Sequence, residues 1–263
     1  MIITDIVSCV HGVDEILSHP ELRSMIREKG VSDYVTMVDI SVQAYLKGEL
    51  EKYAPGYGFM GEEGDREKLD LTKPHWILDP IDGTTNLIHG NPSYAVSLGL
   101  CENGEITAAV IYNPYYEETF FAERGKGAYF MRGKDPDRAE RIRVSEAASL
   151  GRSVIGVGVA PYHKEWIRDN MRRIGDVLTK CQDVHRDGSA ALSLAQVAMG
   201  RMDGFFEVIL QPWDFAAGIL LVTEAGGRVT DFYGQTIDPD HPAAIIASNG
   251  KILEELRMTV AGV

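Results

Sequence analysis

Cysteine is scarce in this sequence, which has three cysteines among 263 residues. Cys9, Cys101 and Cys181 are odd in number, lie far apart and form no C-x-x-C pair. The chain therefore lacks the spacing that indicates a disulfide framework or a zinc site. A chain of this kind is typical of a reducing compartment, and we expect a cytoplasmic protein.

An excess of positive charge and long apolar runs are also missing. The formal net charge is -13, with 26 basic against 39 acidic residues. Proteins that bind nucleic acid or anionic membranes normally carry a basic surface, so we expect neither partner. No apolar run approaches the roughly 18 residues of a membrane span, and the N-terminal stretch lacks the basic segment of a signal peptide. The composition, 44% hydrophobic and 25% charged, is that of an ordinary soluble enzyme.

Hydrophobic spacing predicts the main elements of the first half. A helical pattern runs over 3–17 and is expected to continue through Met25 and Ile26. Residues 30–37 are predicted as a loop or hairpin, and a second helix follows Asp39. Strand-like runs separated by turn residues come next. They lie at 76–78, 94–100, 106–112 and 119–122, with a hairpin turn at 124–127.

The second half alternates strands and helices, which predicts a layered α/β (α+β) architecture. A polar stretch at 133–138 suggests a boundary between an N-terminal lobe, 1–135, and a C-terminal lobe, 136–263, of one catalytic unit. Strands are expected at 154–159, 184, 204–208, 228–230 and 244–247, and helices at 164–178, 190–199, 215–225 and from 252 onward.

The segment Asp79-Pro80-Ile81-Asp82-Gly83-Thr84-Thr85-Asn86 places two carboxylates, a glycine and two hydroxyls in one turn after an apolar run. Asp79 and Asp82 offer the hard oxygen ligands that Mg²⁺ prefers. If Gly83, Thr84 and Thr85 open a helix, their amides point at a phosphate oxygen. The segment therefore suits a metal-bound phosphate. The alternative is an Asp-Pro turn in which Asp82 caps a short helix.

Two further segments carry acids. Glu62 and Glu63 lie in Gly61-Glu62-Glu63-Gly64, and Asp214 follows Gln211-Pro212-Trp213 at the predicted start of a helix. Taken alone, the glutamates suit a solvated loop and Asp214 suits a helix cap. Together with the first segment, they indicate anionic groups that converge around a shared cation.

These three motifs, with Glu224-Ala225-Gly226-Gly227 after Asp214, resemble the inositol monophosphatase family of Mg²⁺-dependent, lithium-sensitive sugar phosphatases. Residues 33–39 resemble the early segment of that family, and 188–192 resemble its substrate-side turn. The likeness spans nearly the whole chain. It implies an αβαβα sandwich, a homodimer and two or three Mg²⁺ ions.

The resemblance also assigns roles. Thr84, oriented by Asp39, helps to deprotonate the attacking water, and Glu63 holds waters and ligands in place through hydrogen bonds. Glu62 is both a metal ligand and a catalytic residue. The metal ligands are Glu62, Asp79, the Ile81 carbonyl, Asp82 and Asp214; the phosphate is bound by Gly83, Thr84 and Thr85, and the substrate hydroxyls by Asp82, Ala190 and Glu207.

Three positions remain open. Lys29 matches a mobile-loop lysine of the family only loosely, and a solvated lysine fits equally well. Relatives commonly have an arginine three residues before Gly188, where this chain has His185 followed by Arg186. A buried or capping Glu207 competes with a substrate contact.

The expected activity is hydrolysis of inositol-1-phosphate and related sugar phosphates by attack of a metal-activated water. Fructose-1,6-bisphosphate is the main alternative, alone or as a second substrate, because some relatives, notably archaeal ones, hydrolyse both. Phosphatases for 3′-phosphoadenosine 5′-phosphate or histidinol phosphate fit less well. A haloacid dehalogenase-type phosphotransferase uses Asp-x-Asp, whereas this chain has Asp-x-x-Asp, and a non-catalytic metal-binding scaffold would not need every acid of the set.

Overall fold

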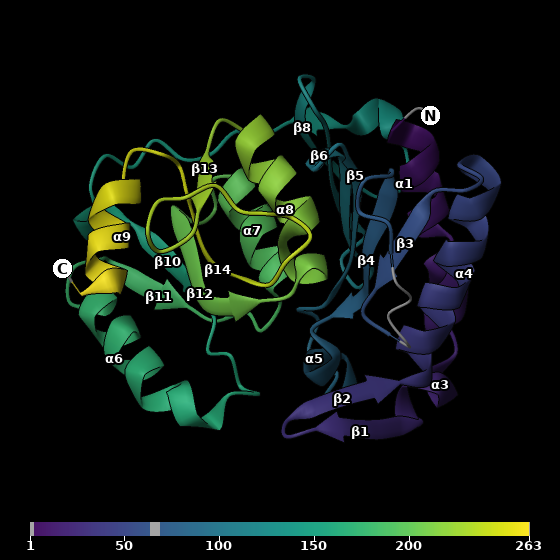
Figure 1. Ribbon diagram of the computed structural model, residues 1–263, viewed down its shortest axis with the longest axis horizontal. Coiled ribbons are helices and arrows are strands. Elements are labelled where there is room, and N and C mark those ends of the chain that lie inside the picture. Colours follow the sequence, from purple (N-terminus) through teal and green to yellow (C-terminus); the bar gives the residue numbers. More distant parts are fainter. Residues whose placement is uncertain (1–2, 64–68, 263) are drawn as a thin grey trace.

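The computed structural model describes residues 3–63 and 69–262, whose elements form layers in the order helix, sheet, helix, sheet, helix (Figure 1). This arrangement agrees with the predicted αβαβα sandwich. Every helix in the described ranges is too short or too polar to span a membrane. The helix layers are α1 (Ile3–His11) with α4 (Met37–Tyr53), α7 (Ala190–Ala198) with α8 (Pro212–Glu224), and α6 (Ile167–Leu178) with α9 (Leu253–Ala261).

The first sheet has seven strands within the described residues, in the order β3-β4-β5-β6-β7-β8-β9. β3 and β4 are parallel, and the other neighbours are antiparallel. The four predicted apolar runs correspond to β4 to β7, and the predicted hairpin turn at 124–127 joins β7 to β8, whereas β3 and β9 were not predicted. The strands are β3 (Gly58–Gly61), β4 (His75–Asp82), β5 (Ala95–Glu102), β6 (Glu105–Asn113), β7 (Glu118–Glu123), β8 (Gly127–Arg132) and β9 (Glu140–Arg141).

The prediction for the N-terminal helix was wrong at its end. The helical pattern is broken into α1, α2 (Val13–Leu17) and α3 (Pro20–Ser24), and Ile26 begins strand β1 (Ile26–Gly30). β1 forms an antiparallel hairpin with β2 (Asp33–Thr36), and all its residues are exposed. A strand with no buried face shows no apolar alternation, so its backbone pairing is invisible to periodicity.

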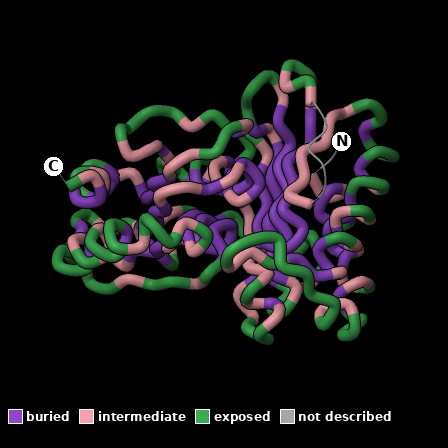
Figure 2. The backbone as a smooth tube through the Cα atoms, turned by 60° about the horizontal axis from the view of Figure 1, so that its bottom comes forward, coloured by how far each residue is buried: buried purple, intermediate pink, exposed green. Residues whose placement is uncertain are grey.

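The two central helices are apolar on nearly every face because both sheets cover them. Most residues of α7 and α8 are buried, and they belong to the largest apolar cluster of the described residues. A Cβ atom at Gly218 of α8 would lie 2.3 Å from the Leu194 side chain of α7. Only glycine lets the two helices approach this closely. Figure 2 shows the resulting continuous buried interior, with exposed chain at its periphery.

The second sheet has five strands within the described residues, in the order β11-β10-β12-β14-β13. β10 is parallel to β11 and β12, and β14 is antiparallel to β12 and β13. The predicted strands and helices of this half are all present, with shifted ends. Because β9 still pairs with β8, the first sheet extends past the proposed lobe boundary. The strands are β10 (Val154–Val157), β11 (Asp183–His185), β12 (Gly204–Leu210), β13 (Arg228–Thr230) and β14 (Ala243–Ser248), and short 3-10 turns lie at Pro136–Arg138, Leu150–Arg152 and Lys164–Trp166.

Candidate active site

A cavity of about 700 Å³ lies where several elements begin or end. Its walls come from the end of β4, the first turns of α5 (Thr84–Ile88), α7 and α8, strand β12 and the β1–β2 hairpin. The structure thus brings residues from all three acidic motifs to one cavity. They are Glu62, Asp79, Asp82 and Asp214.

The end of β4 orients two of these carboxylates. Its pairing with β5 shifts between Asp79 and Asp82, which marks a local irregularity of the kind often found beside active sites. The Ile81 amide donates to Asp79 Oδ1 at 2.9 Å. Asp82 Oδ2 accepts hydrogen bonds from the Ser189 hydroxyl and the Ala191 amide, each at 2.6 Å. These bonds fix both side chains before any ligand binds.

Gly83 links β4 to the short helix α5. Its φ of 97° is left-handed, and a Cβ atom there would lie 2.9 Å from the Ser93 carbonyl oxygen. A side chain at this position would be strained on both counts. Gly83, rather than Asp82, is the N-cap of α5, while Thr84 and Thr85 form its first turn as predicted. The proposed alternative of an Asp82 cap is therefore wrong.

Asp39 and Thr84 are in direct contact. The Thr84 hydroxyl donates to Asp39 Oδ1 at 2.9 Å and also lies 3.1 Å from the Ile81 carbonyl oxygen. The other Asp39 oxygen accepts from the Thr36 amide and hydroxyl in the capping box of α4. Asp39 is fully buried, and burial raises its pKa. The residue is thus both part of a helix cap and the partner of Thr84.

Asp214 reaches the cavity from the first turn of α8. It occupies the third position of the helix, where Oδ2 accepts from the Gln211 amide at 2.7 Å. One carboxylate oxygen each from Asp79, Asp82 and Asp214 lies within 4.8 Å of the other two. This spacing allows one ion or adjacent ions to contact all three side chains.

Burial and mutual repulsion of the carboxylates dominate the electrostatics of this cluster. Burial raises the pKa values of Asp79 and Asp214 well above their usual range, and the neighbouring carboxylates raise them further. Burial also raises the pKa of Asp82 to about 6. Buried carboxylates at this spacing repel one another unless protons or cations neutralise them. These carboxylates therefore suit a divalent metal ion, and because all the ligand atoms are oxygens they suit a hard cation such as Mg²⁺.

Glu62 follows β3 and is held by a lysine. Lys29 Nζ of the hairpin lies 2.8 Å from Glu62 Oε1, 2.8 Å from Glu63 Oε1 and 3.6 Å from Asp33 Oδ1. Burial raises the pKa of Glu62 to about 7, although Lys29 acts to lower it. The open question about Lys29 is answered in favour of a contact with the acids. Gly64, the last residue of this motif, lies outside the described residues.

Two polar residues of the site escaped the sequence analysis. Gln43 of α4 binds the backbone of Glu63 through both ends of its amide, and Ser189 caps α7 while donating to Asp82. A single glutamine among the many polar residues of this helix is a weak signal. Ser189 lies inside the motif at 188–192 and could have been recognised as a cap before an apolar run.

The substrate-side residues lie along the same cavity. Ala190 begins α7, and Glu207 of β12 is buried, with Oε1 accepting from the Ala160 amide at 2.9 Å. Burial raises the pKa of Glu207 to about 7. A Cβ atom at Gly158 would overlap the Glu207 carboxylate, so a side chain there would force that carboxylate to shift. Glu207 is thus both buried and part of the wall.

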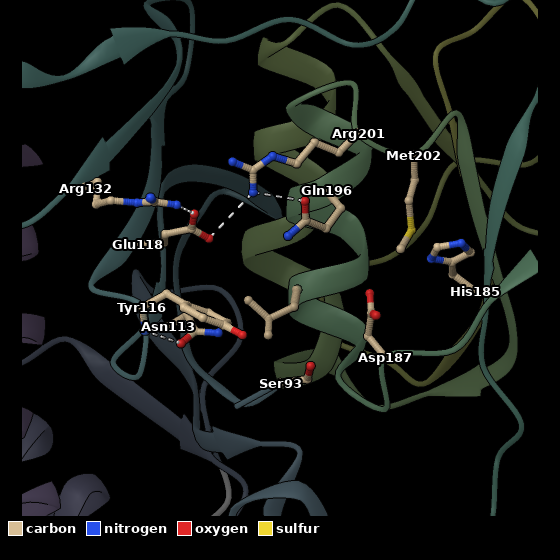
Figure 3. A pocket seen from close by; sticks show the side chains of 11 residues that line it. Ser93, Asn113, Tyr116, Glu118, Arg132, His185, Asp187, Gln196, Arg201 and Met202 are labelled. Atoms are coloured by element: carbon tan, nitrogen blue, oxygen red, sulfur yellow. Dashed lines mark hydrogen bonds and ion pairs between the residues drawn. The ribbon is translucent and has the colours of Figure 1, made fainter. Parts of the chain in front are cut away.

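His185 and Arg186 face different cavities. Arg186 lines the acidic one, whereas His185 lines a neighbouring cavity of about 380 Å³. In that second cavity, the Glu118 carboxylate lies between Arg132, at 2.5 Å, and Arg201, at 3.6 Å (Figure 3). His185, at the position where the family resemblance led us to expect an arginine, therefore does not line the acidic cavity.

Glu224, which forms part of the sequence resemblance, has a structural contact. Its carboxylate accepts from the amides of Gly125 and Gly127 at 2.7 and 2.8 Å. The end of α8 is thereby tied to the β7–β8 turn, away from the acidic cavity.

Comparison with known proteins identifies similar chains. Residues 8–261 match the family model described as the inositol monophosphatase family. An inositol-1-monophosphatase of Rhizobium meliloti is 40% identical over 232 residues, which cover 88% of this chain and 84% of that protein. A crystal structure of the extragenic suppressor protein suhB from Bartonella henselae superposes with a TM-score of 0.86 at 38% identity, covering 97% of each chain. A Thermotoga maritima IMPase superposes with a TM-score of 0.82 at 37% identity, covering 96% and 92% of the two chains.

Proposed function

This chain belongs to the inositol monophosphatase family and is a phosphoric monoester hydrolase, and we propose that it hydrolyses inositol-1-phosphate and related sugar phosphates with Mg²⁺. The observation that carries the proposal is the meeting of Glu62, Asp79, Asp82 and Asp214 in one cavity. Such a set of buried acids suits two or three hard cations. Inhibition by Li⁺ is part of the same proposal, on the strength of the family resemblance.

The residues of the chain bind and orient the reactants. Asp79, Asp82, Asp214, Glu62 and the Ile81 carbonyl would hold the cations. When bound, Mg²⁺ neutralises phosphoryl oxygens and lowers the pKa of water, which makes hydrolysis feasible near neutral pH. The amides at the start of α5 would contact the phosphate.

Thr84 and Asp39 would handle the proton of the attacking water. The existing hydrogen bond sets the direction of transfer, because Thr84 Oγ1 already donates to Asp39 Oδ1. As Thr84 accepts a proton from the water, it can pass its own proton to the carboxylate. A threonine hydroxyl alone is too weak a base for this step, so the buried Asp39 is needed.

Lys29 would move when the site is loaded. Its ammonium group lies against Glu62 and Glu63 in this structure, where it supplies one positive charge to the acids. A cation bound by Glu62 competes with that contact. We therefore expect the β1–β2 hairpin that carries Lys29 to change position between the metal-free and metal-bound forms.

Fructose-1,6-bisphosphate remains a second candidate substrate. Arg186 adds a cationic side chain to the wall of the acidic cavity, and guanidinium groups bind phosphate well. That position suits a second phosphate on the substrate.

An assay of phosphate release from inositol-1-phosphate and from fructose-1,6-bisphosphate, first with Mg²⁺ and then with excess chelator, tests the proposal. We expect Mg²⁺-dependent release from inositol-1-phosphate that Asp79→Asn abolishes. Release from none of the phosphates, by protein that binds Mg²⁺, would favour a non-catalytic scaffold.

The proposal extends to assembly and location. The family resemblance supports a homodimer, which light scattering on the purified protein would measure. The free thiols of Cys9, Cys101 and Cys181 support a reducing, cytoplasmic setting.

A further inference from the structure

A second cluster of metal-ligating side chains lies at the other end of β4. His75 is the first residue of that strand and pairs directly with Cys101 on β5, so both side chains are on one face of the sheet. Asp240 joins them from the connection between β13 and β14, which belongs to the second sheet. Because β4 rises about 3.3 Å per residue, the cluster is roughly 20 Å from the acidic turn at Asp82.

The cluster is closed to solvent and already ordered. The side chains of His75 and Asp240 are 1% and 7% exposed, and Cys101 is fully buried. His75 Nδ1 lies 2.9 Å from the Lys73 carbonyl oxygen, and Nε2 lies 2.7 Å from Asp240 Oδ1. The Cys101 sulfur lies within 4.8 Å of the ligand atoms of His75 and Asp240.

The tautomer of His75 follows from its partners. A carbonyl oxygen can only accept, so Nδ1 carries a proton and the Nε2 side of the ring faces Asp240 and Cys101. Metal-binding histidines in proteins are oriented in the same way, with the other ring N–H donated to a backbone carbonyl.

We propose that His75 Nε2, the Cys101 sulfur and the Asp240 carboxylate form a binding site for Zn²⁺ or a chemically similar divalent transition metal. One nitrogen, one sulfur and one oxygen ligand are suited to zinc, whereas the sulfur disfavours Mg²⁺. The three ligand atoms lie within 4.8 Å of one another. Tetrahedral zinc places its ligand atoms roughly 3.3–3.8 Å apart, so shifts of about 1 Å or less suffice.

The charge balance of the cluster permits one Zn²⁺ to replace two protons. Without metal, the 2.7 Å hydrogen bond between Nε2 and Asp240 Oδ1 contains one proton, and the Cys101 thiol carries another. One Zn²⁺ replaces these two protons, which leave to solvent as the Zn–N, Zn–S and Zn–O bonds form. The net charge of the buried cluster is zero before and after, so binding adds no uncompensated charge. A fourth position is left for water or the second Asp240 oxygen.

The expected role of the ion is structural. It would join the connection between β13 and β14, in the second sheet, to the end of the first sheet where β4 begins and β5 ends. Sequence spacing could not reveal this site, because its ligands are brought together only by strand pairing and by the crossing connection.

Metal titration of the full chain tests the proposal. The protein is stripped with chelator, kept in excess Mg²⁺ and titrated with Zn²⁺ against a chromophoric competitor, and then with Co²⁺. We expect one Zn²⁺ per chain that Mg²⁺ does not displace, and a sulfur-to-metal absorption band with Co²⁺. Raising the pH should tighten binding, because two protons are released.

Variants separate this site from the acidic cavity. Cys101→Ser and Asp240→Asn should each weaken Zn²⁺ binding by about 100-fold or more, a loss at the upper end of that seen for supporting residues. The matched controls Cys9→Ser and Cys181→Ser should bind normally, and Asp79→Asn should keep the Co²⁺–sulfur band. A wild-type protein that shows no such band would overturn the proposal and leave a hydrogen-bonded tether, and so would Zn²⁺ binding that is unchanged in Asp240→Asn. The wild-type titration stands even where a variant fails to fold.

Discussion

Replacing Asp79 with asparagine should make the metal-free protein more stable while it makes the enzyme inactive. Asparagine keeps the shape of the side chain and the acceptor for the Ile81 amide. It removes one negative charge from a group in which three carboxylates lie within 4.8 Å of one another. The substitution therefore relieves repulsion in the metal-free state and removes a ligand from the metal-bound state.

The size of the gain can be bounded. Two full charges about 4.8 Å apart repel by about 3.5 kcal/mol at an effective dielectric constant of ~20. Shared protons already remove part of this repulsion, because the pKa values of Asp79 and Asp214 are raised. We expect Asp79→Asn to raise the unfolding free energy of metal-free protein by about 1–3 kcal/mol. For a chain of this size that is a rise in Tm of roughly 2–10 °C.

The assay compares thermal unfolding in chelator and in Mg²⁺, together with phosphate release. Wild type should gain stability from Mg²⁺, whereas Asp79→Asn should gain little and lose activity by about 1,000-fold or more. The exposed Asp137→Asn provides the control and should match wild type in both measurements. A less stable Asp79→Asn protein that still responds fully to Mg²⁺ would refute the reasoning.

Three further results are expected. Thr84→Ala should lower kcat by about 100-fold and leave Mg²⁺ affinity within a few-fold, as measured by kinetics across Mg²⁺ concentrations, with Thr84→Ser recovering most of the rate. In chelator, the free energy of unfolding should fall as the pH rises from about 4.5 through about 7. The raised pKa values of Glu62 and Glu207 mean that the folded state binds more protons than the unfolded state in this range. A flat or rising profile would contradict this. Glu224→Gln should cost about 1–3 kcal/mol in denaturant unfolding by weakening the two amide contacts, with kcat unchanged; a change in kcat would place Glu224 in the site.

The sequence allowed much of the fold to be predicted because its strands and helices have a buried face. The apolar runs that became β4 to β7 and the alternation in the second half could be read from spacing alone. The wholly exposed strand β1 could not, because its residues make no apolar pattern. The end of the first helix was therefore misplaced at Ile26.

The candidate site shows the same division. The acids could be anticipated because they cluster in short motifs beside turn residues. Local sequence does not encode how the β1–β2 hairpin and α4 pack. That packing determines the spacing of the acids, the contact of Lys29 with Glu62 and the hydrogen bonds of Gln43 to the Glu63 backbone. His75, Cys101 and Asp240 were missed for a similar reason, since strand register and a long crossing connection bring them together.

The close contact of Gly218 with Leu194 has a consequence for catalysis. Asp214 and Gly218 lie on the same helix, α8, which is packed between the two sheets, and one of these sheets carries Asp79 and Asp82. A larger residue at Gly218 would push α8 away from α7 and shift Asp214 relative to Asp79 and Asp82. The ångström-scale spacing of the carboxylates in the cavity therefore limits which substitutions the protein interior tolerates. We expect that a single methyl group at Gly218, remote from the substrate, inactivates the enzyme while the protein stays folded.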